Sequence, residues 1–504
     1  MNDWTHGYDV SVGYIYGFYR EMAPDWLDFC ARARRIRPPR AAGAPFRYLD
    51  LGCGQGFHLC ILAAANPDSE FVGIDFDPAH IEHGRQLAST AGLENIRFIQ
   101  ADFLDLAAAW PGDLGTFDYI VLQGILTWIS ADLRAAVVTC VGHASRQGTL
   151  AYFGYNVAPG WLSAFPFQHF AKALATSSPA PDAVDKALQL FARLSEAGAA
   201  VFNVLPSFQP RLDALQSQSK AYLVHEYLSD HWAPTWHSTI ADELGRVCFE
   251  YAGPATVAEI LLPNALPPPL RDLLADRDGT FAKDLNDIII GQGFRRDIFV
   301  RSPAPDEAPE TNKDVPIHLL TTAPPGSGIT FETAFGTLSV EPQLVADIVD
   351  ELAAGPRRFS ELMQLKNPAR LNNRRMLFLM LHAHMLTVAP STPGSPAAAE
   401  RLNRAIARAA CDGTPYRHVA AATLGSAIAV TELHLLVLDA WLNGARDAGA
   451  IADGVGARLR KLGRELVLHN SAVSDADTPA GLQQLGRSVI SNVIPTWRSL
   501  GVIQ

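Results

Sequence analysis

Cysteine, charge and long apolar stretches are all scarce in this chain. Six cysteines are spread over 504 residues without a C-x-x-C pair, which excludes the usual zinc-ribbon spacings and gives no sign of a disulfide framework. No uninterrupted apolar run reaches the roughly 18 residues that a membrane-spanning helix needs. The first residues also lack the basic and apolar regions of a signal peptide. We therefore expect a cytoplasmic protein with no membrane insertion.

Basic residues are in the minority. The chain has 41 Lys and Arg against 52 Asp and Glu, a net charge of −11, and this balance disfavours a nucleic-acid partner because phosphate binding requires a basic surface. One dense basic run has five arginines between Arg32 and Arg40. Such a run is typical of a solvated helix face, although it could also dock an acidic protein or a phosphate. The length corresponds to about three domains.

Residues 46–155 alternate short apolar runs with helical patterns. We expect strands at 46–51, 70–74, 96–101, 117–123 and 149–155, and helices at 56–66, 77–91 and 131–143. Strands separated by helices of this length imply βαβ units. The predicted fold class is therefore α/β, with a doubly wound parallel sheet.

The alternation stops after residue 155. Residues 156–232 have a mostly helical pattern and are expected to form an insertion above the strand ends, as a lid or regulatory segment. A helix at 236–246 follows, and strands at 247–251 and 295–301 are expected to return to the sheet as an antiparallel edge.

Proline marks the next boundary. Six prolines in residues 302–328 predict an interdomain linker. Residues 1–301 are then one domain that contains the insertion, and residues 329–504 are a helix-rich C-terminal domain.

The sharpest motif is a glycine loop between the first predicted strand and helix. It places Asp50, Gly52, Gly54 and Gly56 at alternate positions. Glycine permits positive φ and a close approach of the backbone to a ligand, and the helix behind it offers free N–H groups. A dinucleotide loop reads G-x-G-x-x-G and would need glycine at position 57, which is Phe57. The observed spacing resembles the loop of class I methyltransferases that use S-adenosylmethionine (SAM).

Side chains at three further strand ends agree with this interpretation. Asp75 and Phe76 end the second strand, where an acid can accept hydrogen bonds from both ribose hydroxyls of SAM. Asp102 and Phe103 follow the third strand, where they can meet the adenine, and Gln123 ends the fourth strand, facing the methionine part. Each acid alone is more often a helix N-cap. Because open α/β sheets bind ligands at these strand ends, the set predicts SAM as cofactor and S-adenosylhomocysteine as product.

The chain also resembles a particular family, the bacterial class I methyltransferases with a methyltransferase regulatory domain, which includes the lysine methyltransferases of rickettsial outer-membrane proteins. The resemblance is carried by residues 14–21, 52–67, 73–80, 155–161 (YNVAPGW), 222–228 (YLVHEYL) and 294–301. It implies a Rossmann-like sheet, a winged-helix-like C-terminal region and a protein acceptor. Where this family often has His-Gly after the fourth strand, this chain has Gln123-Gly124.

Two groups of side chains are candidates for contact with SAM or the acceptor. Tyr16, Tyr19 and Arg20 precede the first strand and could form a gate that touches SAM, or pack on the sheet as an amphipathic helix. Tyr155 and Asn156 end the fifth strand, where the acceptor must lie. Tyr155 would orient the acceptor and Asn156 would hydrogen-bond to it, and the alternative for Tyr155 is a buried structural tyrosine.

The segment His225-Glu226-Tyr227 lies in the predicted insertion. It could supply a base or recognition residues to a lid, although packing of a docking helix is the more common role. Its spacing is not H-E-x-x-H, so zinc is not expected there, and no other metal site is predicted.

Three functions remain open at this stage. The first is methyl transfer to a protein, at a lysine side chain, with the C-terminal domain presenting the acceptor. The second is methyl transfer to a small molecule or biosynthetic intermediate, with the C-terminal half forming a homodimer. The third is a SAM-binding scaffold without catalysis. In both enzymatic cases the protein mainly positions the acceptor, because the cofactor is already activated.

Overall fold

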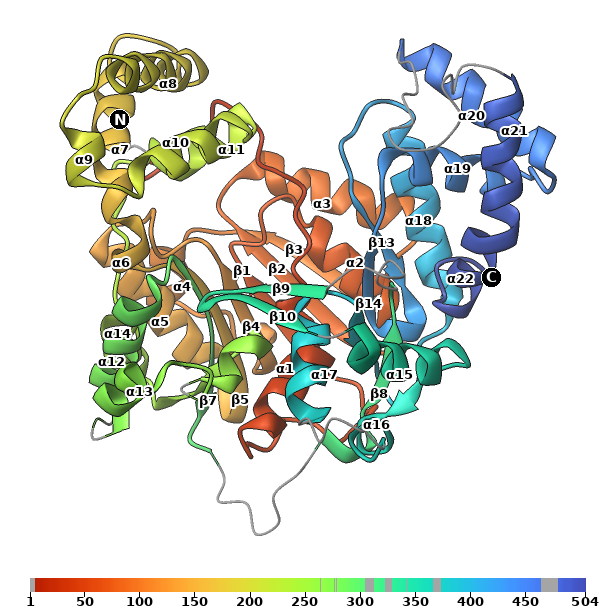
Figure 1. Ribbon diagram of the computed structural model, residues 1–504, viewed down its shortest axis with the longest axis horizontal. Helices are drawn as coiled ribbons and strands as arrows, with labels where there is room; N and C mark the ends of the chain where they lie inside the picture. The colour runs from red at the N-terminus through yellow and green to blue at the C-terminus, as the bar shows by residue number, and fades with distance from the viewer. Residues whose placement is uncertain are drawn as a thin grey trace.

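The protein is built around a seven-stranded sheet in the order β3-β2-β1-β4-β5-β7-β6 (Figure 1). The computed structural model describes residues 5–262, 264–275, 277, 279–303, 312–321, 329–340, 342–365, 373–463 and 479–504. The strands are β1 (Arg47–Leu51), β2 (Glu70–Asp75), β3 (Ile96–Gln100), β4 (Phe117–Gln123), β5 (Ser145–Asn156), β6 (Phe249–Pro254) and β7 (Phe294–Arg301). Strand order reverses between β1 and β4, which is where open α/β sheets bind ligands. The predicted α/β class is confirmed.

Strand β7 runs against the other six strands of this sheet. Strands β1 to β5 pair in parallel, whereas β7 is antiparallel to both β5 and β6. Strand β6 therefore runs parallel to the rest, and the prediction that both late strands form an antiparallel edge is wrong for β6. The reason is that β7, although later in the chain, inserts between β5 and β6.

Helices cover both faces of the sheet. One face packs on α1 (Pro24–Ala33), α2 (Phe57–Ala65) and α3 (Pro78–Thr90), and the other on α4 (Phe103–Ala108), α5 (Ala131–Ala144) and α12 (His237–Gly245). Neighbouring strand residues alternate between the two cores, with Tyr48 in the first and Leu49 in the second. Burial on both faces explains why the strands are continuous apolar runs.

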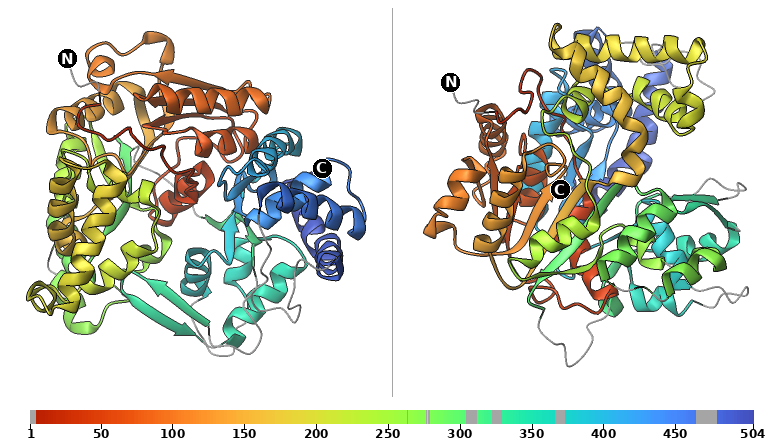
Figure 2. Two further views of the ribbon diagram at one scale, coloured as in Figure 1. Left: turned by 90° about the horizontal axis from the view of Figure 1, so that it is seen from above. Right: turned by 90° about the vertical axis from the view of Figure 1, so that its left-hand side faces the viewer.

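Six helices follow β5 and form a layer with its own core. They are α6 (Ala158–Trp161), α7 (Phe165–Ala175), α8 (Ala180–Glu196), α9 (Val201–Val204), α10 (Phe208–Gln216) and α11 (Lys220–Tyr227). The core contains Phe167, Phe191 and Phe208, which are at most 2% exposed. These helices and the C-terminal helices lie on opposite sides of the molecule (Figures 1 and 2). Helices α13 (Pro268–Ala275) and α14 (Gly279–Ile290) precede β7.

The C-terminal half is rich in helices, as predicted, and its described residues form three small sheets. Strands β8 (Pro316–Leu319), β11 (Arg357–Arg358) and β12 (Leu386–Val388) form one sheet, and hairpins are formed by β9 (Ile329–Thr333) with β10 (Gly336–Val340) and by β13 (His418–Ala421) with β14 (Ser426–Ala429). The helices are α15 (Pro342–Ala353), α16 (Phe359–Met363), α17 (Asn373–His382), α18 (Pro396–Ala410), α19 (Glu432–Leu442), α20 (Ala448–Leu462), α21 (Pro479–Ser488) and α22 (Ile494–Ser499). The winged-helix likeness of this region stays a prediction.

The predicted linker at 302–328 is partly a structural element. Strand β8 lies inside it and pairs antiparallel with β11 and β12, so the C-terminal sheet begins earlier than the proline content indicated. Residues 304–311 and 322–328 of the predicted linker lie outside the described residues.

One hydrophobic core joins the two halves of the chain. It runs from α1, α2 and α3 into α17, α18 and α19 of the C-terminal half. Phe57 at the start of α2 stacks on Tyr416, with ring centroids 4.5 Å apart and planes 5° from parallel. Among the described helices, none is both long and apolar enough to cross a bilayer.

Candidate active site

The glycine loop between β1 and α2 has the backbone conformation that only glycine adopts freely. Gly52, Gly54 and Gly56 have φ values of 76°, 52° and 69°, all in the left-handed region. A Cβ atom on Gly52 would lie 1.8 Å from Cδ1 of Ile125. Gly56 meets the ring of Phe98, 2.5 Å from the position of a Cβ. Gly56 therefore serves the packing of the loop on β3, while Gly52 and Gly54 face a cavity.

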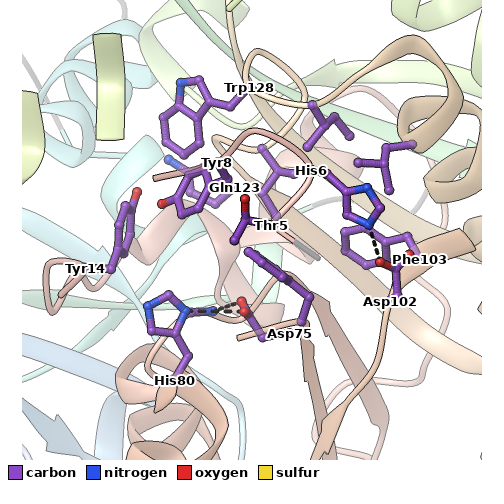
Figure 3. Close-up of a pocket in the computed structure, with 16 residues that line it drawn as sticks. Thr5, His6, Tyr8, Tyr14, Asp75, His80, Asp102, Phe103, Gln123 and Trp128 are labelled. Atoms are coloured by element: carbon purple, nitrogen blue, oxygen red, sulfur yellow. Dashed lines mark hydrogen bonds and ion pairs between the residues drawn. The ribbon is translucent and has the colours of Figure 1, made fainter. Parts of the chain in front are cut away.

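That cavity lies at the carboxyl ends of β1, β2, β3 and β4 and has a volume of about 770 Å³ (Figure 3). Seven of the predicted cofactor residues line it, namely Gly52, Gly54, Asp75, Phe76, Asp102, Phe103 and Gln123. The opposite wall is apolar and comes from the β4–α5 connection and α5, with Ile125, Trp128 and Leu133. A slot with acids at its edge and apolar walls fits a nucleoside.

Asp75 is held in place by backbone donors. Its Oδ2 accepts a hydrogen bond from the N–H of Gly54 at 2.9 Å, and its Oδ1 accepts one from the N–H of Asp77, also at 2.9 Å. His80 lies 3.3 Å from the same Oδ1 through Nδ1, as Figure 3 shows. Burial lowers the pKa of His80, but the hydrogen bond to Asp75 and the charges of Asp75 and Asp77 together outweigh it, so the net pKa is raised. The carboxylate is thus oriented into the cavity with lone pairs still free to accept.

Asp102 combines the two roles that the sequence left open. Its Oδ1 accepts from the N–H of Leu104 at 2.7 Å and caps α4, and the side chain also lines the cavity. Its Oδ2 lies 2.5 Å from Nε2 of His6, which comes from the N-terminal segment (Figure 3). No sequence motif marks His6.

A second cavity of about 490 Å³ continues from the first, with which it shares Tyr14, Gly52, Gly54 and Gln123. Its wall contains Tyr19 and Asp50, two of the residues predicted to contact the cofactor. Asp50 is 3% exposed, and burial, followed by the nearby charge of Asp75, raises its pKa to about 8. A cationic group in this cavity would stabilise the carboxylate form of Asp50.

The N-terminal segment crosses the mouth of the first cavity. Tyr8 stacks on His225 of α11 with centroids 5.3 Å apart. Tyr14 meets His225 edge-on at 5.0 Å and Trp128 at 6.4 Å. Both tyrosines line the cavity. These two tyrosines therefore lie between the cavity and a histidine of the insertion, and a gating role for the segment stays a prediction.

Two of the predicted contacts lie elsewhere. Tyr16 packs on Tyr416, with centroids 4.8 Å apart, and on His83 at 5.1 Å, and it lines neither cavity. The side chain of Arg20 is also outside both cavities and donates to backbone carbonyls of the C-terminal half. Along this segment Tyr14 and Tyr19 face the cavities, while Tyr16 faces the C-terminal half. Tyr16 and Arg20, which the sequence predicted to contact SAM, therefore contact the C-terminal half instead.

Tyr155 matches the alternative of a buried structural tyrosine. It is fully buried, and its hydroxyl donates to Oδ2 of Asp297 at 2.6 Å. Asp297 also receives hydrogen bonds from Arg295 and contacts His237. Tyr155 points to one face of the sheet, whereas Gly154 and Asn156 point to the other. The network of Tyr155 therefore lies on the face opposite Asn156.

Asn156 links the end of β5 to α11. Its Nδ2 donates to Oε1 of Glu226 at 2.6 Å. Glu226 is 5% exposed, and burial raises its pKa to about 7. The segment at 225–227 thus contacts the rest of the domain at two points, since His225 packs on Tyr8 and Tyr14, which line the first cavity, and Glu226 holds a strand-end side chain. Among the described residues, no three His, Cys, Asp or Glu side chains are grouped as a metal site.

Comparisons with known proteins give the following likenesses. Residues 44–149 match a family model described as a methyltransferase domain, and residues 219–301 match one described as a predicted methyltransferase regulatory domain. The uncharacterized protein sll1526 of Synechocystis sp. is 31% identical over 369 residues, 72% of each chain. The uncharacterized protein RP789 of Rickettsia prowazekii is 25% identical over 254 residues, 49% of this chain and 45% of that protein. The structure of PKMT2 from Rickettsia typhi in complex with AdoHcy has the same fold, with a TM-score of 0.72 at 17% identity, covering 96% of this chain and 99% of that one.

Proposed function

The chain belongs to the SAM-dependent methyltransferases that carry a methyltransferase regulatory domain, and from this premise we propose that it methylates lysine side chains of a protein. SAM is its cofactor and S-adenosylhomocysteine its product. The observation that carries the choice of a protein acceptor is a third cavity between the sheet and the C-terminal half.

We assign the first two cavities to SAM. Asp75 accepts hydrogen bonds from the ribose hydroxyls, and Asp102 with Phe103 holds the adenine. Because His6 contacts Asp102, this contact must break before Asp102 can accept from the adenine. The ammonium group of the methionine part lies near Asp50, whose raised pKa is then lowered by the cation. These roles rest on the shared lining of the two cavities and on the positions of the carboxylates.

The third cavity has a volume of about 640 Å³ and shares Tyr19 with the methionine end of the cofactor site. Its lining comes from the N-terminal segment, from Arg296 on β7, and from the C-terminal half, including His384 and Trp497. Most of this lining lies outside residues 44–149, the part that matches the methyltransferase-domain model. A wall built largely by the C-terminal half supports an acceptor that this half presents, a polypeptide segment with its reacting side chain directed past Tyr19.

Bound SAM supplies a methyl group that is activated by its sulfonium. The chain must then present an amine that is neutral, because an ammonium has no lone pair to attack with. Arg20, Arg296 and Glu21 line the third cavity, so two guanidinium groups face one carboxylate, and the excess positive charge lowers the pKa of an incoming lysine by like-charge repulsion. Their positions therefore favour the nucleophilic form of the acceptor. Tyr19 lines both the second and the third cavity, so it restricts the path by which the acceptor side chain reaches the cofactor.

The test is incubation of the purified protein with methyl-labelled SAM and a bacterial lysate. We expect labelled protein bands that yield methylated lysine on acid hydrolysis, and no label with the Asp75→Asn variant. Label confined to low-molecular-weight products would show that the acceptor is a small molecule and not a protein. Tight SAM binding without any labelled product would support a scaffold instead.

A further inference from the structure

A fourth cavity lies at the other edge of the sheet, away from the three described above. It has a volume of about 750 Å³ and shares no lining residue with them. Its walls are the end of α1, strands β6 and β7, and helices α13 and α14, the last two of which lie beside β7 in Figure 1. Apart from Arg34, its lining residues belong to the segment that matches the regulatory-domain model.

The charges around this cavity are unbalanced. Among the described residues, four cationic side chains line it, from Arg34, Arg277, Lys283 and Arg295, against one carboxylate, Glu259. This is the reverse of the whole chain, which carries a net charge of −11. Of these four cations, Arg295 has its charge matched by described acids, because it donates to Asp287 at 2.6 Å and to Asp297 at 2.7 Å.

The other cations have no acidic partner in the described part of the chain. No ion pair or hydrogen bond of the Arg34 or Lys283 side chain is present there, and the Lys283 ammonium lies 5.5 Å from the centre of the Tyr251 ring. Burial, together with the charges of Arg34 and Arg295, lowers the pKa of Lys283. The single acid, Glu259, is engaged by Gln292, whose Nε2 donates to it at 2.9 Å. An anion entering the cavity would relieve this repulsion.

The backbone is shaped to hold Arg34 in this position. Strand β6 has a register irregularity between Tyr251 and Gly253, and Gly253 has a φ of 142°. A Cβ atom on Gly253 would lie 2.9 Å from Cγ of Arg34. The absence of a side chain at Gly253 therefore lets the stem of Arg34 lie flat across the strand, beside the cavity. Arg34 is exposed, but this contact gives one arginine of the basic run at 32–40 a specific place beside the cavity.

We propose that this cavity binds a small organic phosphate. A phosphate dianion presents several oxygens and can contact Arg34 and Lys283 together, whereas a single carboxylate suits one bidentate arginine. The apolar lining of Ile260, Leu262 and Leu274 receives the organic part of the ligand. The proposal concerns a site separate from SAM and the acceptor and does not depend on which acceptor is methylated.

The test is calorimetric titration of the full-length protein with inorganic pyrophosphate and with hexyl phosphate, each at two salt concentrations. We expect binding of hexyl phosphate with a Kd below about 1 mM, stronger than that of pyrophosphate and weakened by salt. Arg34→Gln and Lys283→Gln should each weaken it by about tenfold or more. SAM affinity, measured on the same samples, should stay unchanged and show that the variants are folded.

Arg35→Gln is the matched control. Arg35 is the next residue in the same basic run, is exposed, and does not line the cavity. The Arg35→Gln substitution removes the same charge as Arg34→Gln and should leave hexyl phosphate binding unchanged. The proposal is overturned if wild type binds neither probe, or if Arg35→Gln weakens binding as much as Arg34→Gln and Lys283→Gln do.

Discussion

At the scale of single residues, Asp75 is the side chain on which cofactor binding depends most directly. Asp75→Asn keeps the shape of the residue but removes the charge that strengthens its hydrogen bonds to hydroxyl donors. We expect the Kd for SAM to rise by roughly 10- to 150-fold, equivalent to about 1.5–3 kcal/mol, when measured by calorimetric titration with SAM and S-adenosylhomocysteine.

Asp77→Asn provides the control for this prediction. Asp77 accepts from the N–H of Ala79 at 2.8 Å as the N-cap of α3, and it does not line the cofactor cavity. Asparagine caps a helix about as well as aspartate, so SAM affinity should change by less than about threefold, about 0.6 kcal/mol. Equal losses in the two variants would contradict the role assigned to Asp75.

Glu226 should make the stability of the protein depend on pH. Burial raises its pKa from 4.5 to about 7 in the folded state, so the native protein binds its proton more tightly than the unfolded chain does. The stabilisation from this group is complete below pH 4.5 and is lost as pH rises through about 7. Glu226→Gln remains neutral and can still accept from Asn156. Between pH 5 and pH 8 we expect the free energy of unfolding of the variant, relative to wild type, to increase by up to about 3 kcal/mol. The difference in melting temperature between variant and wild type should rise accordingly over this pH range.

Other buried acids titrate in both proteins and cancel in this difference. Glu82→Gln, on the exposed side of α3, should give a difference that does not vary with pH. A flat difference for Glu226→Gln as well would mean that Glu226 is not held in its acid form.

At the scale of elements, the N-terminal segment divides its tyrosines between two surfaces. Tyr14 lines both parts of the cofactor site and packs on His225, whereas Tyr16 packs on Tyr416. Tyr14→Ala should weaken SAM binding by about tenfold or more, because a buried aromatic side chain contributes about 1.5–3 kcal/mol. Tyr14→Phe should largely retain SAM binding, and the same calorimetric titration measures both variants.

Tyr16→Ala is the matched change on the other surface. It should lower the melting temperature, since contact with the C-terminal half is lost, and leave the Kd for SAM unchanged. If Tyr16→Ala weakened SAM binding as strongly as Tyr14→Ala, the division of the segment between the two surfaces would be wrong.

At the scale of the whole molecule, Arg20 ties the two halves of the chain together. Its guanidinium donates to the carbonyl oxygens of Leu381 at 2.5 Å, His382 at 3.3 Å and Leu386 at 3.4 Å, and it lies 4.2 Å from the centre of the Trp26 ring. Arg20→Met keeps the apolar stem but removes the guanidinium donors to these carbonyls. We expect a loss of about 3 kcal/mol, seen as a lower midpoint in denaturant unfolding.

The outcome for Arg20 also reports on how the molecule unfolds. Because one core joins both halves, wild type should show a single calorimetric transition. Arg20→Met should keep one transition at a lower temperature, and Glu21→Gln, next to it, should change little. An unchanged midpoint in Arg20→Met would show that the halves are held by the core alone.

The amino-acid sequence by itself determined the α/β core and brought seven of the predicted cofactor residues to one cavity. The loop at 50–56 and the acids at 75 and 102 could be predicted because they follow strands directly, and the carboxyl ends of parallel strands meet at one edge. The directions of β6 and β7 could not be predicted in full, since the order of strands in a sheet need not follow their order in the chain.

Tertiary structure alone decided which distant segments cover that edge. Tyr8 and Tyr14 line the first cavity and pack on His225, and Tyr16 and Arg20 turn to the C-terminal half instead. Likewise Arg34 and Lys283 share one cavity only because a glycine in β6 lets the arginine lie across the strand. Hydrophobic periodicity encodes which face of an element is buried, but not which partner buries it, and these side chains are placed by their partners.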